Sequence, residues 1–510
     1  MMRSEMMLSA LPPARTWMRM PAVLPCALFG SSSMQSFSAL RLHPIVHTVS
    51  RITQEARAAV YLVGGAVRDA LSGIGRAHDF DFALFDGFDG LVAAFARSVR
   101  GKVIPWDVDQ QRVVFRQGGS RITADFSRMN QTDIIFDLQQ RDFTVNAMAL
   151  ALHEPGTCLI DPLGGQADLD ARCLRMCSKQ AFEADPLRML RAFRLARQLS
   201  CVIEPLTLAS IHRNSALIVH SARERVKREL FAILHAPERE ASLRALFDTG
   251  LLAQLLPDIA VIEGVQQSAP HEHTLFEHSL RTAGFLDEAL RITQSCCSDL
   301  QAQSDEYLNQ SLEEGVTMMS LLCFAALLHD IGKPECASEQ AGRIHFYGHE
   351  RSGARIIRGM ARSVGLGRKA QSVLAVLVEQ HMRILHMSLL ESVSERAKAR
   401  FVRDCGPAAV GACLLAIADS LATGSGPEYR DSSRRVRDIA ADLCARILAT
   451  SDLQETAPLL TGADVMDALQ SGQGPQVGRI LKQAARLERN GTLHDREGAL
   501  AWLRSQRPTD

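Results

Sequence analysis

The sequence lacks several features that mark specialised classes of protein. Only 5% of its 510 residues are aromatic, and its 57 basic residues are balanced by 57 acidic ones. So few aromatic residues argue against an extended stacking platform for single-stranded nucleic acid. A net charge of zero provides no global field for nucleic acid, so such binding needs local basic patches. The sequence contains no run of about 18 apolar residues, which would indicate a membrane span, and we expect no membrane partner.

The pattern of cysteines argues against a disulfide-rich protein. The 12 cysteines are scattered and form no pair of Cys-x-x-Cys motifs, which indicates a reducing compartment rather than a disulfide scaffold. We therefore expect a cytoplasmic protein. The chain is too long for a single core, and its length predicts three or four domains.

The first 45 residues differ in composition from the rest. They contain several arginines, many serines and methionines, and a single acidic residue, Glu5. This composition resembles a transit peptide. The alternatives that we favour are a gene start assigned too early, with Met34 as the initiator, or a disordered tail, so residues 1–45 are left out of the predicted fold.

The stretch from Ala59 to Phe85 carries the strongest chemical signal. It opens with a short apolar run, which predicts a buried strand. Gly64 and Gly65 then allow a tight turn and the close approach of a ligand. The residues after them predict a helix, whose first amides and dipole favour phosphate, with Arg68 one turn into it.

Two acidic residues follow in the same stretch. Because side chains alternate along a strand, Asp79 and Asp81 face one side, while Phe80 and Phe82 anchor the other. Paired carboxylates suit hard divalent cations. Together with the phosphate-binding turn, they predict phosphoryl or nucleotidyl transfer with two metal ions. Asp125, on a later predicted strand, is either a third carboxylate of this site or a solvent-facing residue.

Two further polar clusters follow. The segment from Gln140 to Asn146 groups Arg141, Asp142 and Asn146, and Arg141 offers a bidentate fork to a triphosphate. Residues 182–197 predict one helix on which Asp185 and Arg188 present acceptors and donors suited to a base edge. Arg191 continues a basic stripe on this helix, for which the alternative is a solvated charged face.

A separate constellation of histidines and aspartates lies between residues 271 and 419. Its members stand mostly at the ends of predicted helices, where imidazoles and carboxylates suit a divalent transition metal or a mixed dinuclear site. The alternative for any one of them is a histidine of the core. The predicted ligands are His278, His329, Asp330, His349, His381 and Asp419.

The order of these motifs resembles a known family. LVGGAVRDAL, DFD, RDFTVNAMAL and DPLGG follow one another as in class II tRNA nucleotidyltransferases and bacterial poly(A) polymerases. The resemblance implies that Asp79 and Asp81 hold two Mg²⁺ ions, and Asp125 is the third candidate catalytic residue. It also implies that Gly65, Arg68 and Arg141 bind the incoming nucleotide. The full set of predicted nucleotide-binding residues is Gly64, Gly65, Arg68, Arg141, Asp142, Asn146, Asp185, Arg188 and Arg191.

Two departures from the family pattern stand out. The family often has two arginines before the aspartate of RDFTVNAMAL, and here the first is Gln140. The family's Glu-Asp-x-x-Arg motif, which replaces a template in pairing with CTP or ATP, has Ala184 at its Glu position. Base selection would therefore depend on Asp185 and Arg188. The histidine–aspartate constellation resembles the HD phosphohydrolase superfamily, in which His349 and His381 would serve a second metal.

The resemblance implies an α+β fold class. A polymerase-beta-like nucleotidyltransferase head, with a small mixed sheet and helices, would be followed by an all-α neck, an HD domain and a C-terminal helical domain. The predicted boundaries are 46–170 for the head, 171–268 for the neck, 269–425 for the HD domain and 426–510 for the tail domain.

The predicted activity is template-independent addition of CMP and AMP to the 3′ end of tRNA, from CTP and ATP. A metal-dependent phosphohydrolase activity on phosphoester ends would accompany it. The first alternative is a poly(A) polymerase, or a tRNA enzyme that adds only A or only CC. An alternative of another class is an HD phosphohydrolase whose head only binds RNA.

Overall fold

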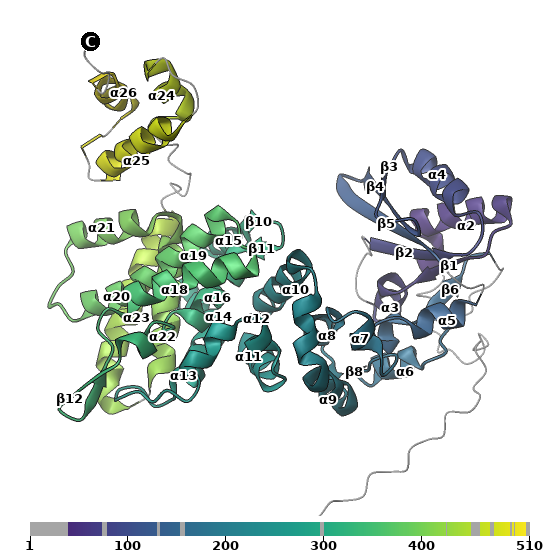
Figure 1. Ribbon diagram of the computed structural model, residues 1–510, viewed down its shortest axis with the longest axis horizontal. Coiled ribbons are helices and arrows are strands. Elements are labelled where there is room, and N and C mark those ends of the chain that lie inside the picture. Colours follow the sequence, from purple (N-terminus) through teal and green to yellow (C-terminus); the bar gives the residue numbers. More distant parts are fainter. Residues whose placement is uncertain are drawn as a thin grey trace, which may run out of the picture. The chain divides into compact units, whose positions relative to one another are not determined.

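The computed structural model of the chain comprises two compact units (Figure 1). Unit 1 is Met1–Arg188 with Leu199–Ser210, and unit 2 is Met189–Gln198 with Ile211–Asp510. A mixed sheet in the first unit and helices in the second confirm the predicted α+β class. The residues that the structure describes are 39–73, 79–129, 133–153, 159–295, 300–424, 426–449, 459–469, 474–489, 492–493 and 495–505.

The head of the chain is built on a seven-stranded sheet in the order β3-β4-β5-β2-β1-β6-β7. β2 and β5 are parallel, and the other neighbouring pairs are antiparallel. The strands are β1 (Val60–Val63), β2 (Asp79–Leu84), β3 (Lys102–Pro105), β4 (Gln110–Gln117), β5 (Ser120–Arg128), β6 (Ala149–Ala151) and β7 (Leu159–Ile160).

Helices α2 and α4 cover one face of this sheet, where Phe80 and Phe82 are buried in the same core. Ile45, on α2, is 1% exposed in that core, so the head includes the last residues that the sequence interpretation assigned to the tail. Residues 1–38 of that tail lie outside the described residues. The helices of the head are α2 (Pro44–Ala56), α3 (Gly65–Leu71), α4 (Phe88–Val99), α5 (Ile134–Gln139), the 3-10 turn η2 (Thr144–Asn146) and α6 (Gly165–Asp170).

The helix predicted over residues 182–197 is in fact two helices, α7 (Ala181–Ala184) and α8 (Arg188–Gln198). Asp185 between them is extended, with φ −147° and ψ 99°. The cause is Pro186, because the residue before a proline is excluded from the helical region. The remaining elements of this region are β8 (Cys173–Leu174), β9 (Val202–Ile203), α9 (Pro205–Asn214), η3 (Ser215–His220), α10 (Arg223–His235), α11 (Arg239–Asp248), α12 (Leu251–Leu255) and η4 (Pro257–Ile262).

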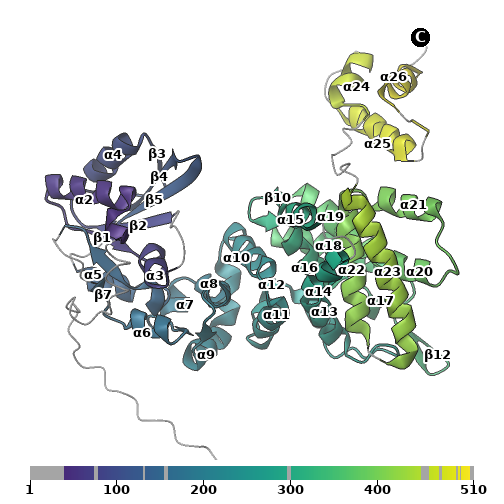
Figure 2. The same cartoon turned by 180° about the vertical axis from the view of Figure 1, so that it is seen from behind.

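Unit 2 continues as helices packed around α16 (Met318–Leu328), all of whose residues are buried. α13 packs on α16 and α22, while α18 packs on α19 and α22 on α23 (Figure 2). The further elements are α13 (Leu275–Gly284), α14 (Leu286–Ser295), α15 (Gln301–Asn309), β10 (Ser311–Glu313), β11 (Val316–Thr317), α17 (Lys333–Cys336), β12 (Ser338–Gln340), β13 (Arg343–His345), α18 (His349–Val364), α19 (Arg368–Gln380), α20 (Met382–Ser388), α21 (Glu395–Cys405), η6 (Gly406–Ala408), α22 (Ala409–Thr423) and α23 (Pro427–Ala449).

The polar, weakly periodic segment 295–314 predicts an insertion loop, but Gln301–Asn309 within it form helix α15. Tyr307 on this helix is buried, and its hydroxyl donates to the carbonyl of Pro407 at 3.0 Å. One helical stretch, Glu395–Thr423, has the length and hydropathy of a membrane span, but 78% of its most apolar window is buried inside the protein, as in a core helix.

The last helices form a small core of their own. α24 (Gly462–Leu469), α25 (Pro475–Arg489) and α26 (Arg496–Ser505) bury Val465, Ala499 and Leu503 against one another. Arg496 pairs with Asp464 at 2.7 Å, which ties α26 to α24.

Candidate active sites

The glycine turn of the head follows β1 directly. Gly64 has φ 73° and ψ −135°, a backbone conformation that is essentially restricted to glycine. A Cβ atom at Gly64 would stand 3.2 Å from both Arg141 Nη1 and Asp81 Oδ2. The turn therefore lies directly beside one candidate catalytic carboxylate and one candidate phosphate-binding guanidinium.

The two acidic residues of β2 share the sheet face that points away from the core of α2 and α4. Asp79 is exposed and Asp81 is half-buried, whereas Phe80 and Phe82 between and after them are buried. In the parallel pairing of β2 with β5, Asp81 stands opposite Asp125. Residues opposite each other in register project to the same face, so three carboxylates share it. This donor set fits a divalent cation bound through oxygen.

Arg112 on β4 holds the third carboxylate. Its Nε and Nη2 donate to the two oxygens of Asp125, both at 2.7 Å. This bond, together with the charges of Asp125, Asp79 and Asp81, raises the pKa of Arg112. Each oxygen of Asp125 keeps a second lone pair for another partner, and its role as a ligand remains a prediction.

A buried polar chain supports the turn from behind. Arg68 is 5% exposed, and its Nη1 donates to Asn146 Oδ1 at 2.5 Å. Asn146 Nδ2 in turn donates to Asp142 Oδ1 at 3.1 Å, and Asp69 accepts from Arg68 Nε at 2.8 Å. The structure thus brings together Arg68, Asp142 and Asn146, which the sequence could only group by motif.

The two residues predicted to read the base, Asp185 and Arg188, make local hydrogen bonds. Arg188 donates to the carbonyl oxygens of Gln140 at 2.8 Å and Arg141 at 3.3 Å, so its guanidinium is held beside the segment that carries Arg141. Asp185 Oδ1 accepts from the amide of Leu187 at 3.2 Å. Arg191, by contrast, belongs to unit 2, whereas the other predicted nucleotide-binding residues belong to unit 1.

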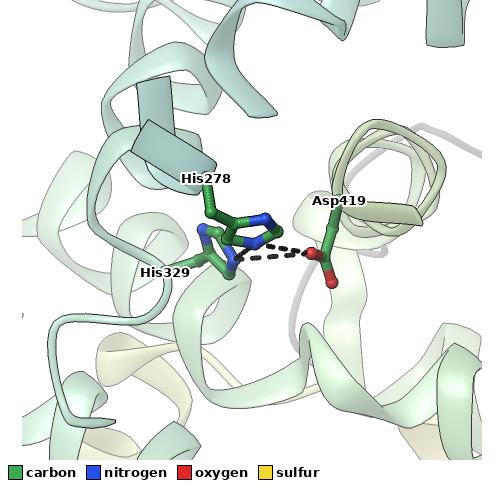
Figure 3. A group of neighbouring side chains, drawn as sticks. All are labelled: His278, His329 and Asp419. Atoms are coloured by element: carbon green, nitrogen blue, oxygen red, sulfur yellow. Dashed lines mark hydrogen bonds and ion pairs between the residues drawn. The ribbon is translucent and has the colours of Figure 1, made fainter. Parts of the chain in front are cut away.

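The second site, which we call the HD site, consists of His278, His329, Asp330, His349, His381 and Asp419. His278 and His329 aim their Nε2 atoms at Asp419 Oδ1, at 3.0 and 3.7 Å (Figure 3). The two Nε2 atoms lie 3.3 Å apart. His278 comes from α13, His329 from the end of α16 and Asp419 from α22, so three helices distant in sequence form this group.

A second group adjoins the first. His349 Nε2 and His381 Nε2 lie 3.1 Å apart, and they approach Asp330 Oδ1 at 3.1 and 3.5 Å. The other oxygen of Asp330, Oδ2, lies 3.2 Å from His329 Nε2. Asp330 therefore faces both groups, with one oxygen directed at each. All six predicted ligands of the HD site come together.

The outer nitrogens of three imidazoles fix their tautomers. His329, His349 and His381 each direct Nδ1 at a backbone carbonyl oxygen, at 2.8, 2.8 and 2.6 Å. A carbonyl only accepts, so Nδ1 carries a proton, and Nε2 is the atom that presents a lone pair inward when the ring is neutral. Converging lone pairs and carboxylates fit a divalent cation.

The electrostatics of the HD site agree with a cation. Burial lowers the pKa of His329, but Asp330 and Asp419 outweigh burial and raise it to about 10. Burial likewise opposes ionisation of Asp330 and Asp419, yet the neighbouring histidines hold both pKa values well below the ordinary range. The site thus holds its acids ionised and gathers positive charge around them.

Two residues next to the HD site were not predicted from the sequence. Lys333 is 6% exposed, and its Nζ lies 2.7 Å from Asp330 Oδ2. Its spacing of three residues after Asp330 was the available signal. His271, edge-on to His278 with ring centroids 4.9 Å apart, had no such signal. Burial, with Lys333 and His278 nearby, lowers the pKa of His271 to about 3.

The HD site opens into a cavity of about 610 Å³. The lining includes four of the six site residues and adds Lys333 and Arg343 as cationic side chains. A cavity of this size has the dimensions of a small-molecule site.

Three family models match the chain in order. They are the poly(A) polymerase head domain over residues 60–175, the "probable RNA and SrmB-binding site of polymerase A" over residues 202–262, and the HD domain over residues 275–424. The first covers the glycine turn with the acidic residues of β2, and the third covers all six residues of the HD site.

Curated relatives match most of the chain. The A-adding tRNA nucleotidyltransferase of Deinococcus radiodurans is 33% identical over 452 residues, which are 87% of this chain and 94% of the relative. The CC-adding tRNA nucleotidyltransferase of Thermus thermophilus is 30% identical over 454 residues, covering 86% of this chain and 92% of the relative. The multifunctional CCA protein of Haemophilus influenzae is 29% identical, over 64% of this chain and 75% of the relative.

Solved structures share the fold. The Thermotoga maritima CCA-adding enzyme complexed with tRNA matches 92% of this chain and 98% of its own at TM-score 0.54 and 20% identity. A CCA-adding enzyme in complex with ATP matches 92% of this chain and 95% of its own at TM-score 0.55 and 19% identity.

Proposed function

The chain belongs to the tRNA nucleotidyltransferase family with a poly(A) polymerase head domain, and from this premise we propose that it adds CMP and AMP to the 3′ end of tRNA from CTP and ATP. The observation that carries the proposal is the position of the Gly64 turn. A Cβ atom at Gly64 would stand 3.2 Å from both Asp81 Oδ2 and Arg141 Nη1. A triphosphate in this turn would meet a metal-binding carboxylate and a guanidinium together. We propose the cytoplasm as its compartment.

Each residue of the head has a distinct part in this proposal. Asp79 and Asp81 would hold Mg²⁺, which when bound lowers the pKa of the acceptor hydroxyl and neutralises charge on the phosphates. Gly64 leaves space for the triphosphate, and Arg141 binds its oxygens through a planar fork. Arg68, fixed by Asn146, keeps the first turn of α3 in place.

Base selection falls to Asp185 and Arg188. Arg188 is held by the carbonyls of Gln140 and Arg141, so the proposed base contact lies beside the segment that carries the proposed triphosphate contact. Ala184 stands where the family has Glu, which removes one acceptor from the base-reading set. The A-adding relative of Deinococcus radiodurans favours a second candidate, addition of A alone.

The HD site is proposed as a phosphohydrolase centre for phosphoester ends. Its imidazoles and aspartates would hold a divalent metal that supplies a hydroxide nucleophile when bound. Asp330 would position the metal, because the two oxygens of Asp330 face the two histidine groups. The four domains with boundaries 46–170, 171–268, 269–425 and 426–510 remain our proposed division of these tasks.

The deciding experiment uses three tRNAs, which end at the base before the CCA sequence, after its first C and after its second C. Each tRNA is supplied with CTP alone, ATP alone or both. CCA addition predicts completion of every substrate when both nucleotides are present. Addition of A alone predicts extension only of the tRNA that ends in CC. Long A tails on unrelated RNA would instead identify a poly(A) polymerase, and no incorporation at all would leave the HD phosphohydrolase with an RNA-binding head.

A further inference from the structure

An exposed aromatic pair stands at the wall of the HD cavity. Tyr347 is 71% exposed, and its ring is stacked on that of His345, with centroids 5.3 Å apart and planes inclined by 9°. Both residues line the cavity. Beside Tyr347, the exposed large aromatic side chains of the described residues are Trp106 and Phe136. A flat, backed ring at a cavity wall offers its free face to a planar partner.

The backbone keeps this ring close to one of the metal ligands. Tyr347 precedes the ligand His349 by two residues, so their Cα atoms lie at most about 7 Å apart. His349 Nδ1 directs its proton at the carbonyl of Phe346 at 2.8 Å, which restrains the intervening segment. The ring and His349 therefore belong to one short, restrained segment of the cavity wall.

The hairpin that carries the ring is itself anchored. β13, which ends at His345, is bonded to the segment before α13: the amide of Ile344 donates to Ser268 Oγ at 2.8 Å, and Arg343 Nη2 donates to the carbonyl of Ala269 at 2.9 Å. These bonds hold the wall against the same cavity into which Asp330 and Asp419 open.

The lining of the cavity combines charged and apolar side chains. Lys333, whose Nζ lies 2.7 Å from Asp330 Oδ2, adds positive charge beside a metal ligand, and Arg343 adds a second cationic side chain to the lining. Met382, Leu385 and Leu389 add apolar surface to the same lining. Cationic groups together with apolar surface and a flat ring fit a phosphate joined to an aromatic base.

We propose that Tyr347, backed by His345, is the base-stacking platform of the HD site, which therefore takes a phosphorylated nucleoside end rather than a simple phosphomonoester. This inference rests on the proposed phosphohydrolase function of the same site. Tyr347 is a specificity residue in this scheme: it holds the base, while the histidines and aspartates act on the phosphate.

The test compares three substrates in the full chain supplied with Mn²⁺: adenosine 2′-monophosphate, 2′,3′-cyclic AMP and glycerol 2-phosphate, which lacks a base. For Tyr347→Ala we expect KM for the two adenosine substrates to rise at least about fivefold, the low end of what base–aromatic stacking contributes. KM for glycerol 2-phosphate should change less than about twofold on the same argument, since it has no ring to stack. Tyr347→Phe, which keeps the ring, should restore the native values.

Glu339→Ala is the matched control. Glu339 lies on β12 of the same hairpin, is exposed, and does not line the cavity. Equal KM changes for all three substrates in Tyr347→Ala, or none, would overturn the platform. If the native chain hydrolyses none of them, the phosphohydrolase proposal fails by itself. The platform is then decided by calorimetric binding of adenosine 2′-monophosphate, which should weaken at least about fivefold in Tyr347→Ala. Equal binding by both proteins would reject it.

Discussion

The head and the HD site assemble their candidate metal ligands in opposite ways. The head offers carboxylates on an open sheet face, where Asp79 is exposed and Asp125 is already held by Arg112. The HD site buries its ligands, with His278 and His329 wholly inaccessible and Asp330 2% exposed. A preassembled, buried set binds a metal by itself, whereas an open set of few oxygens needs further ligands, which a nucleotide triphosphate supplies.

The difference follows from the elements that carry the ligands. Strand β2 presents alternate residues to one face, and the opposite face is fixed by Phe80 and Phe82 in the core. The HD ligands stand at or near the ends of helices, where free carbonyls fix the outer nitrogens of His329 and His381. Sheet geometry thus favours a site completed by substrate, and helix ends favour a resident metal.

The largest predicted effect separates the two sites. Asp79→Asn should lower nucleotide incorporation about a thousandfold, a loss of about 4 kcal/mol of transition-state stabilisation, because one carboxylate of the metal pair loses its charge. Phosphohydrolase activity of the same preparation should stay within twofold. A matched control is Asp89→Asn, which changes an exposed acidic residue at the start of α4. A similar loss in this control would mean that the effect is not specific to the metal pair.

The converse substitution should give the second largest effect. Asp330→Asn removes the carboxylate that faces both histidine groups, so phosphohydrolase activity should fall about a hundredfold or more, as expected when a ligand that positions a metal is lost. Incorporation should be unaffected. Metal content after desalting, measured by atomic emission, should fall together with hydrolysis. Retention of a full metal complement would contradict the role of Asp330.

A smaller effect tests the glycine turn. Gly64→Ala forces a side chain into a positive-φ position and within 3.2 Å of Asp81 and Arg141, and KM for nucleotide should rise about tenfold, equivalent to about 1.4 kcal/mol. Gly73→Ala is the matched control, because Gly73 also has positive φ but no atom within 4 Å of its Cβ position. In Gly73→Ala, backbone strain should lower the melting temperature, and KM for nucleotide should not rise. Equal KM values for both variants would show that the turn is not beside the nucleotide.

The smallest effect concerns pH. In the metal-free protein the pKa of His329 is raised to about 10, and a metal requires the neutral ring. Below that pH the metal must displace a proton, so affinity should rise with pH, by up to about tenfold per unit for one proton. Titration calorimetry with the metal at pH 6.5, 7.5 and 8.5, about 1 unit apart, in two buffers would measure the metal affinity and the number of protons released on binding. Affinity independent of pH would contradict the raised pKa.

The sequence predicted the chemistry of both sites better than their supports. Alternation along residues 79–82 was sufficient to place both acids on one face, because a strand has a fixed period. The fork between Arg112 and Asp125 was not predictable, since it depends on the register of β4 with β5. Likewise, the bonds from Arg188 to carbonyls of residues 140 and 141 join segments nearly fifty residues apart.

Helix continuity shows a second limit. Apolar spacing over residues 182–197 indicated one helix, but Pro186 excludes Asp185 from helical geometry and divides it. Helix α15 shows the reverse, because tertiary burial of Tyr307 stabilises a helix whose sequence is weakly periodic. The break at Pro186 follows from a local rule that the sequence itself displays, whereas the formation of α15 depends on packing that the sequence does not show.

The most direct test of the account is anomalous diffraction from a crystal of the chain with Mn²⁺ and a non-hydrolysable CTP or ATP analogue. The account predicts manganese between the carboxylates of Asp79 and Asp81, in contact with the triphosphate at the Gly64 turn. A bound triphosphate at that turn with no manganese at either carboxylate would contradict it.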